Sequence, residues 1–173
     1  MGDYSSQSAA QHRRQAPERV GCAVLTVSDT RRPEDDRGGQ AIRQMLAAAG
    51  HSVEQYQIVP DESGPLTEAV RQSTRRSAID VILITGGTGI ASRDQTPDTV
   101  KKLYTKVLPG YGELFRMLSY EEIGAAALLS RASGGLVGRT VVLTMPGSPA
   151  AVRLAMEKLI LPELAHLVEQ ARR

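Results

Sequence analysis

Four short apolar runs divide the chain, and small polar residues, charged residues or glycines follow each of them. The runs are VGCAVLTV (20–27), SVEQYQIV (52–59), VILIT (81–85) and TVVLTM (140–145). Their length and their β-branched residues predict strands. The first run is apolar almost without a break, which indicates a strand covered on both faces.

Helical spacing marks the segments between the runs. Apolar residues three and four positions apart predict three helices, with faces formed by Ile42, Met45, Leu46 and Ala49, by Leu66, Ala69 and Val70, and by Val100, Leu103, Tyr104 and Val107. Gly50 stands where a glycine often ends a helix. Thr96-Pro97 has the form of an N-cap followed by the first helical residue, and Leu108-Pro109-Gly110 would end that helix. A long C-terminal helical region should be interrupted near Pro162.

Strands that alternate with helices predict an α/β domain, a three-layer Rossmann-like fold with a mainly parallel sheet. We expect one domain over residues 19–173, because 173 residues suit a single core and no repeat or linker divides them. Residues 1–18 are polar and without pattern, which predicts a disordered N-terminal tail.

Most of the candidate chemistry follows the four strands. The loops there are Ser28-Asp29-Thr30, Pro60-Asp61-Glu62, Thr85-Gly86-Gly87-Thr88-Gly89 and Pro146-Gly147-Ser148-Pro149. Ligands of an open parallel sheet bind outside the carboxyl ends of its strands. We therefore expect these loops to border one pocket.

Two of these loops suit phosphate binding. The glycine-rich loop and Pro-Gly-Ser-Pro each present backbone N–H groups ahead of a helix start. Each could equally be a simple turn, the second one with its serine as a helix N-cap. Neither has the lysine of a P-loop or the spacing of a dinucleotide fingerprint, so hydride transfer is disfavoured.

Asp61 and Asp94 bring two carboxylates to the same region. Taken alone, Asp61 could form a turn, and Asp94 could complement the dipole of the following helix. Taken together beside phosphate-binding backbone, they suit Mg²⁺-assisted phosphoryl or nucleotidyl transfer, because the cation offsets repulsion between the anions.

Composition excludes other classes of function. One Phe, five Tyr, no Trp and a net charge of +2 leave little with which to bind nucleic acid. No apolar run is long enough for a membrane span. The single cysteine, Cys22, lies inside an apolar run, which is typical of a core residue in a cytoplasmic protein. No Ser-His-Asp or Cys-His arrangement is evident.

Six segments, in this order along the chain, resemble the MoaB/Mog family of molybdenum cofactor biosynthesis proteins. They are VLTVSDTR, VPDE, ITGGTGIASRDQTPD, GYGELFRMLSYEEIG, LLSRA and MPGSPAAV. The third is the most specific, and the spacing and the SDTR start are closer to the MoaB branch. The resemblance implies a molybdopterin adenylyltransferase, which uses Mg²⁺ to transfer AMP from ATP to the terminal phosphate of molybdopterin and releases pyrophosphate. The product would then pass to other enzymes of the pathway.

The resemblance also implies roles for individual residues. Asp61 and Asp94 would be the essential acids and would hold Mg²⁺. The nucleotide would contact Gly86, Gly87, Thr88, Gly89, Pro146, Gly147 and Ser148; Ser119, Ser130 and Arg131 would shape the pterin pocket; Ser28 and Asp29 would lie at its rim. Two positions depart from the family pattern: Gly38 stands where serine is common, and Gln95 where a small apolar residue is common.

Two other interpretations stay open. A nucleotide pyrophosphatase or amidase of the competence-damage type has a similar domain, but normally carries a second one. A molybdopterin carrier that does not adenylylate its ligand is the non-enzymatic alternative. The family resemblance further implies a trimer or a hexamer, and the apolar segment 110–129 suits either a subunit interface or the core.

Overall fold

The computed structural model describes residues 16–173, and its strands form one six-stranded sheet. The strands are β1 (Gly21–Val27), β2 (Ser52–Val59), β3 (Val81–Thr85), β4 (Lys106–Val107), β5 (Gly134–Val137) and β6 (Thr140–Met145). They lie in the order β2-β1-β3-β6-β5-β4. The four strands predicted from the sequence run parallel, and β5 pairs antiparallel with both β6 and β4.

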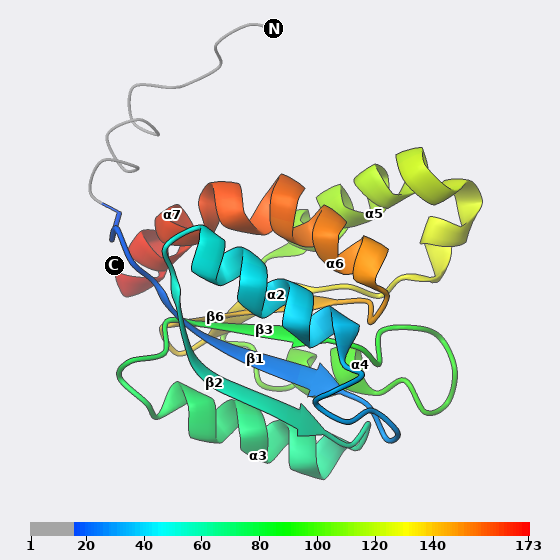
Figure 1. Cartoon of the computed structure of the whole chain (residues 1–173), viewed down its shortest axis with the longest axis horizontal. Coiled ribbons are helices and arrows are strands. Elements are labelled where there is room, and N and C mark those ends of the chain that lie inside the picture. The colour runs from blue at the N-terminus through cyan, green and yellow to red at the C-terminus, as the bar shows by residue number, and fades with distance from the viewer. Residues whose placement is uncertain (1–15) are drawn as a thin grey trace, which may run out of the picture.

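Helices cover both faces of the sheet (Figure 1). They are α2 (Arg37–Ala48), α3 (Ser63–Thr74), α4 (Thr96–Lys101), α5 (Pro109–Ile123), the 3₁₀ turn η1 (Gly124–Leu129), α6 (Pro149–Ala155), the π-helical turn η2 (Met156–Ile160) and α7 (Leu161–Arg172). One face packs on α2, α5, α6 and α7, and the other on α3 and α4. The predicted three-layer α/β fold with a mainly parallel sheet is confirmed.

Apolar cores lie on both faces of the sheet. Every residue of β1, β3 and β6 is buried, because helices from both layers cover these central strands. Cys22 is buried within β1, as expected, and burial raises the pKa of its thiol to about 12. Of the predicted N-terminal tail, residues 1–15 lie outside the described residues, and the domain boundary at residue 19 stays a prediction.

The segment around Leu108 differs from the sequence prediction. The helix expected to reach Val107 ends at Lys101, and the chain then forms β4. Just before β4, Thr105 N–H donates to the carbonyl of Leu136 at 2.7 Å. Tyr104 faces the side-chain-free surface of Gly135 instead of a helix face. Pro109 begins α5 rather than ending a helix, because a proline in the first turn sacrifices no helical hydrogen bond.

The start of α4 differs from the sequence prediction, whereas the start of α7 agrees with it. Thr96 is the first residue of α4 and not its N-cap; that position is Gln95, whose side chain makes no capping bond. The predicted interruption near Pro162 is confirmed: Pro162 lies in the first turn of α7, directly after the π-helical turn. A widened turn accommodates a proline because the missing N–H and the ring would disturb a regular helix.

Candidate functional site

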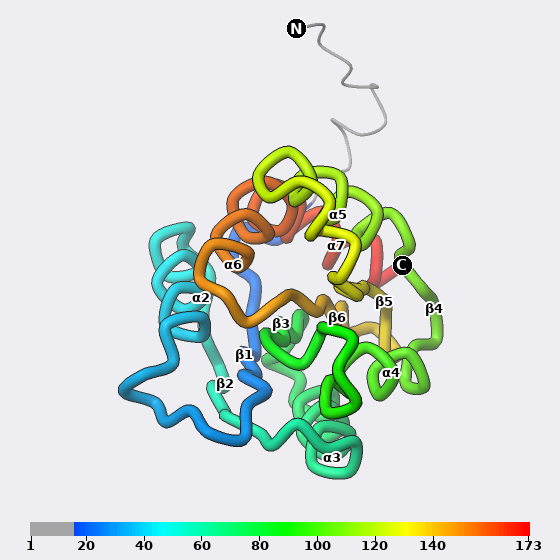
Figure 2. The backbone as a smooth tube through the Cα atoms, turned by 90° about the vertical axis from the view of Figure 1, so that its right-hand side faces the viewer, coloured from blue at the N-terminus to red at the C-terminus, as the bar shows by residue number. Residues whose placement is uncertain are grey.

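The loops that follow the four parallel strands meet at one edge of the sheet, as predicted. Figure 2 looks onto this edge. Ser28 N–H donates to the carbonyl of Val59 at 2.9 Å, and Gly86 N–H donates to the carbonyl of Met145 at 3.0 Å. These bonds join the loop after β1 to the end of β2, and the loop after β3 to the end of β6.

The glycine-rich loop turns in a way that side chains disfavour. Gly86 and Gly87 have φ values of +105° and +61°. A Cβ atom on Gly86 would lie 2.3 Å from the carbonyl oxygen of Val27. The chain can pass this close to β1 only with glycine, and the turn brings the next residues against two carboxylates.

Asp61 lies directly behind this turn. Its side chain is only 7% exposed, and Oδ1 accepts a hydrogen bond from Gln95 N–H at 3.1 Å. A Cβ atom on Gly87 would stand 2.6 Å from Asp61 Oδ2. Burial raises the pKa of Asp61, the negative charges of Asp94 and Asp29 raise it further, and the Gln95 N–H bond partly opposes them.

Asp94 lies against the next glycine of the loop. Its Oδ2 accepts from Ala91 N–H at 2.9 Å and would be 2.7 Å from a Cβ atom on Gly89. Within residues 16–173, Asp61 Oδ2 and Asp94 Oδ1 accept no hydrogen bond. Each aspartate therefore has one oxygen that accepts from a backbone N–H group and one that accepts from no group of the described residues.

This donor set fits Mg²⁺. Among the residues that the structure describes, no three His, Cys, Asp or Glu side chains form a metal cluster. Mg²⁺ usually takes one or two carboxylates and fills its remaining positions with water and substrate phosphates. Asp61 and Asp94 can supply that share, and hard carboxylate oxygens are the appropriate donors.

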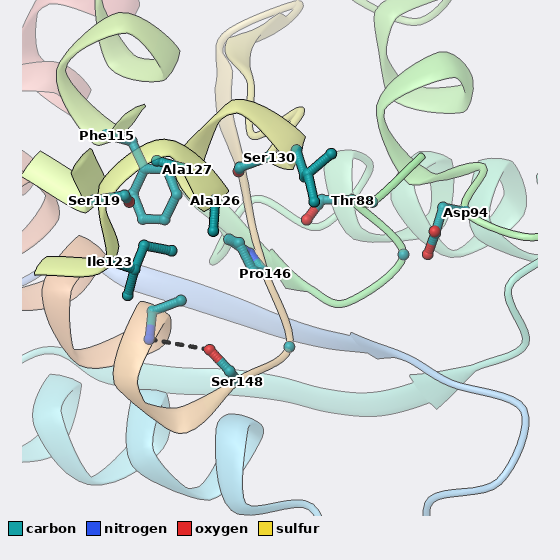
Figure 3. Close-up of a pocket in the computed structure, with 15 residues that line it drawn as sticks. Thr88, Asp94, Phe115, Ser119, Ile123, Ala126, Ala127, Ser130, Pro146 and Ser148 are labelled. Atoms are coloured by element: carbon teal, nitrogen blue, oxygen red, sulfur yellow. Dashed lines mark hydrogen bonds between the residues drawn. The ribbon is translucent and has the colours of Figure 1, made fainter. Parts of the chain in front are cut away.

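A pocket of about 320 Å³ opens beside the loop (Figure 3). It is lined by Gly87, Thr88, Gly89, Asp94, Phe115, Ser119, Ile123, Ala126, Ala127, Leu129, Ser130, Pro146, Gly147, Ser148 and Ala151. Phe115 and Ile123 lie toward one end, and Thr88 and Asp94 toward the other. The pocket is thus apolar on the α5–η1 side and polar on the side of the glycine-rich loop.

Backbone N–H groups at the polar end have no partner. Those of Gly87, Thr88 and Gly89 donate to no group within the described part of the chain, and the same holds for Gly147 and Ser148. Buried or half-buried N–H groups normally find an acceptor. An anion at this end would supply one. Ser148 Oγ also accepts from Ala151 N–H at 3.2 Å, so this serine is the N-cap of α6.

Some predicted site residues lie outside this pocket, and Asp61 is one of them: it is buried beneath the glycine-rich loop and does not line the cavity. Ser28 and Asp29 line a separate groove along β2, where Asp29 Oδ2 pairs with Arg93 Nε at 2.8 Å. That bond is the main reason why the pKa of Asp29 is lowered. Gly86 packs beneath the loop, and the side chain of Arg131 bonds to the loop instead of lining the pocket. Their predicted contacts with nucleotide or pterin stay predictions.

Two charged residues near the Pro-Gly-Ser loop, Arg31 and Asp36, were not among the predicted site residues. Arg31 Nη2 donates to the carbonyl of Gly147 at 3.2 Å, and its Nη1 lies 3.9 Å from Asp36 Oδ1. Asp36 is fully buried and accepts from Thr26 Oγ1 at 2.6 Å, from Tyr56 OH at 2.7 Å and from Gly39 N–H at 3.0 Å. The SDTR segment contains Arg31, but a partner 116 positions away leaves no signal in a local pattern.

Gly38, one of the two departures from the family pattern, lies at the same place. A Cβ atom on Gly38 would be 3.4 Å from the carbonyl oxygen of Gly147, which is ordinary contact distance. A serine side chain at position 38 would fit beside the Pro-Gly-Ser loop. With glycine at this position, the contact that a serine hydroxyl would make with the loop is absent.

No helix within residues 16–173 is long and apolar enough to cross a membrane. This agrees with the absence of a long apolar run in the sequence.

Comparisons with known proteins agree with this geometry. A family model described as "Probable molybdopterin binding domain" matches residues 23–166. Molybdenum cofactor biosynthesis protein B of Bacillus anthracis is 50% identical over 167 residues, which cover 96% of this chain and 99% of that protein. A crystal structure of molybdenum cofactor biosynthesis protein B aligns with a TM-score of 0.89 at 51% identity, covering 92% and 99% of the two chains. For the tungsten cofactor synthesizing protein MoaB from Pyrococcus furiosus the TM-score is 0.82 at 37% identity, over 91% and 100%. The chain therefore belongs to the MoaB/Mog family of molybdenum cofactor biosynthesis proteins, with their probable molybdopterin-binding domain.

Proposed function

We propose that this protein is a molybdopterin adenylyltransferase, which transfers AMP from ATP to the terminal phosphate of molybdopterin. One observation carries the proposal: Asp61 and Asp94 both lie against glycines of a loop whose unpartnered N–H groups line the pocket. Carboxylates beside an anion site have a clear use when a divalent cation and phosphates bind together.

The two ends of the pocket suit the two parts of the reaction. The apolar side, with Phe115 and Ile123, offers surface to a pterin ring, and Ser119 and Ser130 can orient its polar groups. The N–H groups of Gly87, Thr88 and Gly89 can hold phosphate oxygens. Asp61 and Asp94 would hold Mg²⁺, which supplies charge neutralisation between the phosphates when it is bound.

The chemical step needs little from the side chains. An oxygen of the terminal phosphate of molybdopterin forms a bond to the α-phosphorus of ATP. The bond between that phosphorus and the oxygen bridging to the β-phosphorus breaks, and pyrophosphate leaves. The attacking phosphate oxygen is already ionised at neutral pH, so no general base is required. The protein contributes alignment and electrostatic stabilisation.

Pyrophosphate release tests this proposal. The purified protein should release pyrophosphate only when molybdopterin, ATP and Mg²⁺ are all present. Asp94→Ala should lower the rate by about a hundredfold or more, because losing a cation ligand removes several kcal/mol of transition-state stabilisation. Glu68→Gln is the matched control, since Glu68 is an exposed residue of α3 bonded only to Gln72.

Two results would contradict the proposal. Near-normal turnover by Asp94→Ala would show that the site is wrongly assigned. Binding of molybdopterin without any dependence on ATP or Mg²⁺, together with no pyrophosphate release, would identify a carrier instead of an enzyme.

We also propose that the chain self-associates as a trimer or a hexamer. Within segment 110–129, Phe115 and Ala127 are buried in the core, but a set of large apolar side chains outside the pocket is exposed on α5 and η1: Leu114, Met117, Tyr120 and Leu128. Such a surface on a small domain is typical of a subunit interface. Sedimentation velocity should find an oligomer, and Leu128→Asp, at a position 84% exposed, should shift it toward monomer. A monomeric wild-type protein would refute this.

A further inference from the structure

Residues 88–94, here called the aspartate loop, connect the end of β3 to α4 and contain neither helix nor strand. Thr88, Gly89 and Asp94 of this loop line the pocket. Inside the loop, Asp94 N–H donates to the carbonyl of Ala91, and Ala91 N–H donates to the Asp94 carboxylate. These two bonds shape the loop but do not fix where it lies relative to the pocket.

Arg131 attaches the aspartate loop to the rest of the fold. Its backbone N–H donates to the carbonyl of Thr88 at 3.0 Å, and its Nε donates to the carbonyl of Gly89 at 2.7 Å. One terminal nitrogen, Nη2, donates to the carbonyl of Asp94, and the other, Nη1, donates to Asp98 Oδ2 at 2.6 Å. Asp98 is in α4, so a single residue holds both ends of the loop and the helix after it.

Two other side chains within residues 16–173 hold the connection between β3 and α4 by hydrogen bonds: Asp61, whose Oδ1 accepts from Gln95 N–H at 3.1 Å directly after the aspartate loop, and Arg93 inside it. Arg93 pairs with Asp29 and with Glu62 Oε1, the latter at 3.5 Å, and its side chain is 55% exposed. Exposed ion pairs of this kind contribute little to stability. Arg131 makes three donations to carbonyls and one to a carboxylate, and charge-assisted bonds are roughly twice as strong as neutral ones. Within residues 88–94 themselves, most contacts with the rest of the fold are therefore made by Arg131.

The segment that contains Arg131 also reaches the pocket. Arg131 directly follows Ser130, and Ser130 lines the pocket next to η1. The Arg131 side chain itself lies outside, bordering a second cavity of about 480 Å³ that it shares with Arg116. Arg131 is thus covalently joined to Ser130, which lines the pocket, and is hydrogen-bonded to Gly89 and Asp94, which also line it.

We propose that Arg131 is a positioning residue that couples the two substrates of the proposed adenylyl transfer. A ligand that fills the apolar side fixes the Ser130 segment, and through Arg131 it fixes Gly89 and Asp94 for the nucleotide and cation. Molybdopterin then tightens nucleotide binding, and by linkage the nucleotide tightens molybdopterin binding by the same factor. The inference rests on the proposed function for the identity of the two ligands.

The test compares Arg131→Lys with Arg116→Lys. Lysine keeps the charge but cannot reach Gly89, Asp94 and Asp98 together. Arg116 is a matched control, because it borders the same second cavity and donates to a carbonyl, that of Ala132, outside the loop. Hydrogen exchange of the Ala91 and Asp94 N–H groups, which have acceptors in the loop, should be about tenfold faster in ligand-free Arg131→Lys and unchanged in Arg116→Lys.

Calorimetry then measures the coupling itself. Titration with the α,β-methylene analogue of ATP and Mg²⁺, without and with molybdopterin, avoids turnover because the bond that must break is replaced. In the wild type, molybdopterin should lower the Kd of the analogue at least about fivefold, and in Arg131→Lys this factor should fall toward one. In turnover, kcat should fall more than KM for ATP rises.

The possible failures are distinguishable. Unchanged loop exchange and unchanged coupling in Arg131→Lys would overturn this inference while leaving adenylyl transfer intact. Coupled binding without pyrophosphate release would overturn the proposed reaction and leave Arg131 as the coupling residue. If Arg131→Lys speeds exchange in α3 as well, the whole domain is destabilised. Asp98→Asn, at an exposed position, must then raise exchange in the aspartate loop alone, and its failure to do so overturns the inference.

Discussion

Gly87→Ala should damage both stability and activity, for two separable reasons. Gly87 has φ +61°, and an alanine in this left-handed conformation costs about 1–2 kcal/mol. The new Cβ atom would also stand 2.4 Å from Thr96 Oγ1, 2.6 Å from Asp61 Oδ2 and 2.9 Å from Asp61 Oδ1. Real Cβ atoms do not approach oxygens so closely, so the Asp61 carboxylate must move.

Two other glycines separate the strain from the contact. Gly50 has φ +82° with no atom within 4 Å of its Cβ position, so Gly50→Ala carries the strain alone. Gly110 lies in the first turn of α5 with open space around it and no positive φ, so Gly110→Ala should leave stability unchanged or raise it.

The three variants should differ in Tm and in the rate of pyrophosphate release. Strain of about 1–2 kcal/mol lowers Tm by about 2–8 °C in a domain of this size. Gly50→Ala should show that shift and keep its activity. Gly87→Ala should lose more stability than Gly50→Ala and also lose pyrophosphate release. Equal Tm values for the two variants, with full activity in Gly87→Ala, would refute the contact between this turn and Asp61.

Two further changes test the carboxylates. The raised pKa of Asp61 means that its charge opposes folding above the ordinary aspartate pKa of about 4, and fully so above the raised value. Asp61→Asn should therefore abolish activity, and its Tm at neutral pH should equal or exceed that of the wild type. The difference in Tm should vanish on acidification, and a difference in Tm that does not depend on pH would contradict this. Tyr56→Phe removes a 2.7 Å bond to the fully buried Asp36 carboxylate and should cost about 1.5–3 kcal/mol in chemical denaturation, whereas the exposed Tyr120→Phe should cost nothing measurable.

Local patterns in the sequence predicted what depends on neighbouring residues. Long apolar runs identified the four parallel strands, and parallel strands place their following loops at one edge. The positions of Asp61 and Asp94 beside the glycine-rich loop followed from that alone. β4 and β5 were not predicted, because they have only two and four residues and β5 begins with Gly134-Gly135, which carry no side-chain pattern.

Contacts between distant parts of the chain could not be predicted in this way. Arg131 reaches Gly89 across 42 positions, and Arg31 reaches Gly147 across 116. A flexible arginine in a loop has many potential partners, and only the folded backbone selects among them. The sequence therefore predicts the glycine-rich loop and the carboxylates beside it, and it singles out Arg131, but it does not predict the contacts by which Arg31 and Arg131 hold their loops in place.

The buried Asp36 has a consequence for the outer strand of the sheet. Tyr56 belongs to β2, the edge strand, and its hydroxyl bonds to Asp36, which faces Arg31, which in turn holds Gly147 after β6. These polar contacts connect the margin of the molecule to the Pro-Gly-Ser loop, which lines the pocket. We therefore expect substitutions at exposed positions of β2 to alter the affinity of the pocket for its ligand when they lie close to Tyr56. The effect of a substitution on β2 should follow the distance of the substituted residue from Tyr56 more closely than the solvent accessibility of that residue.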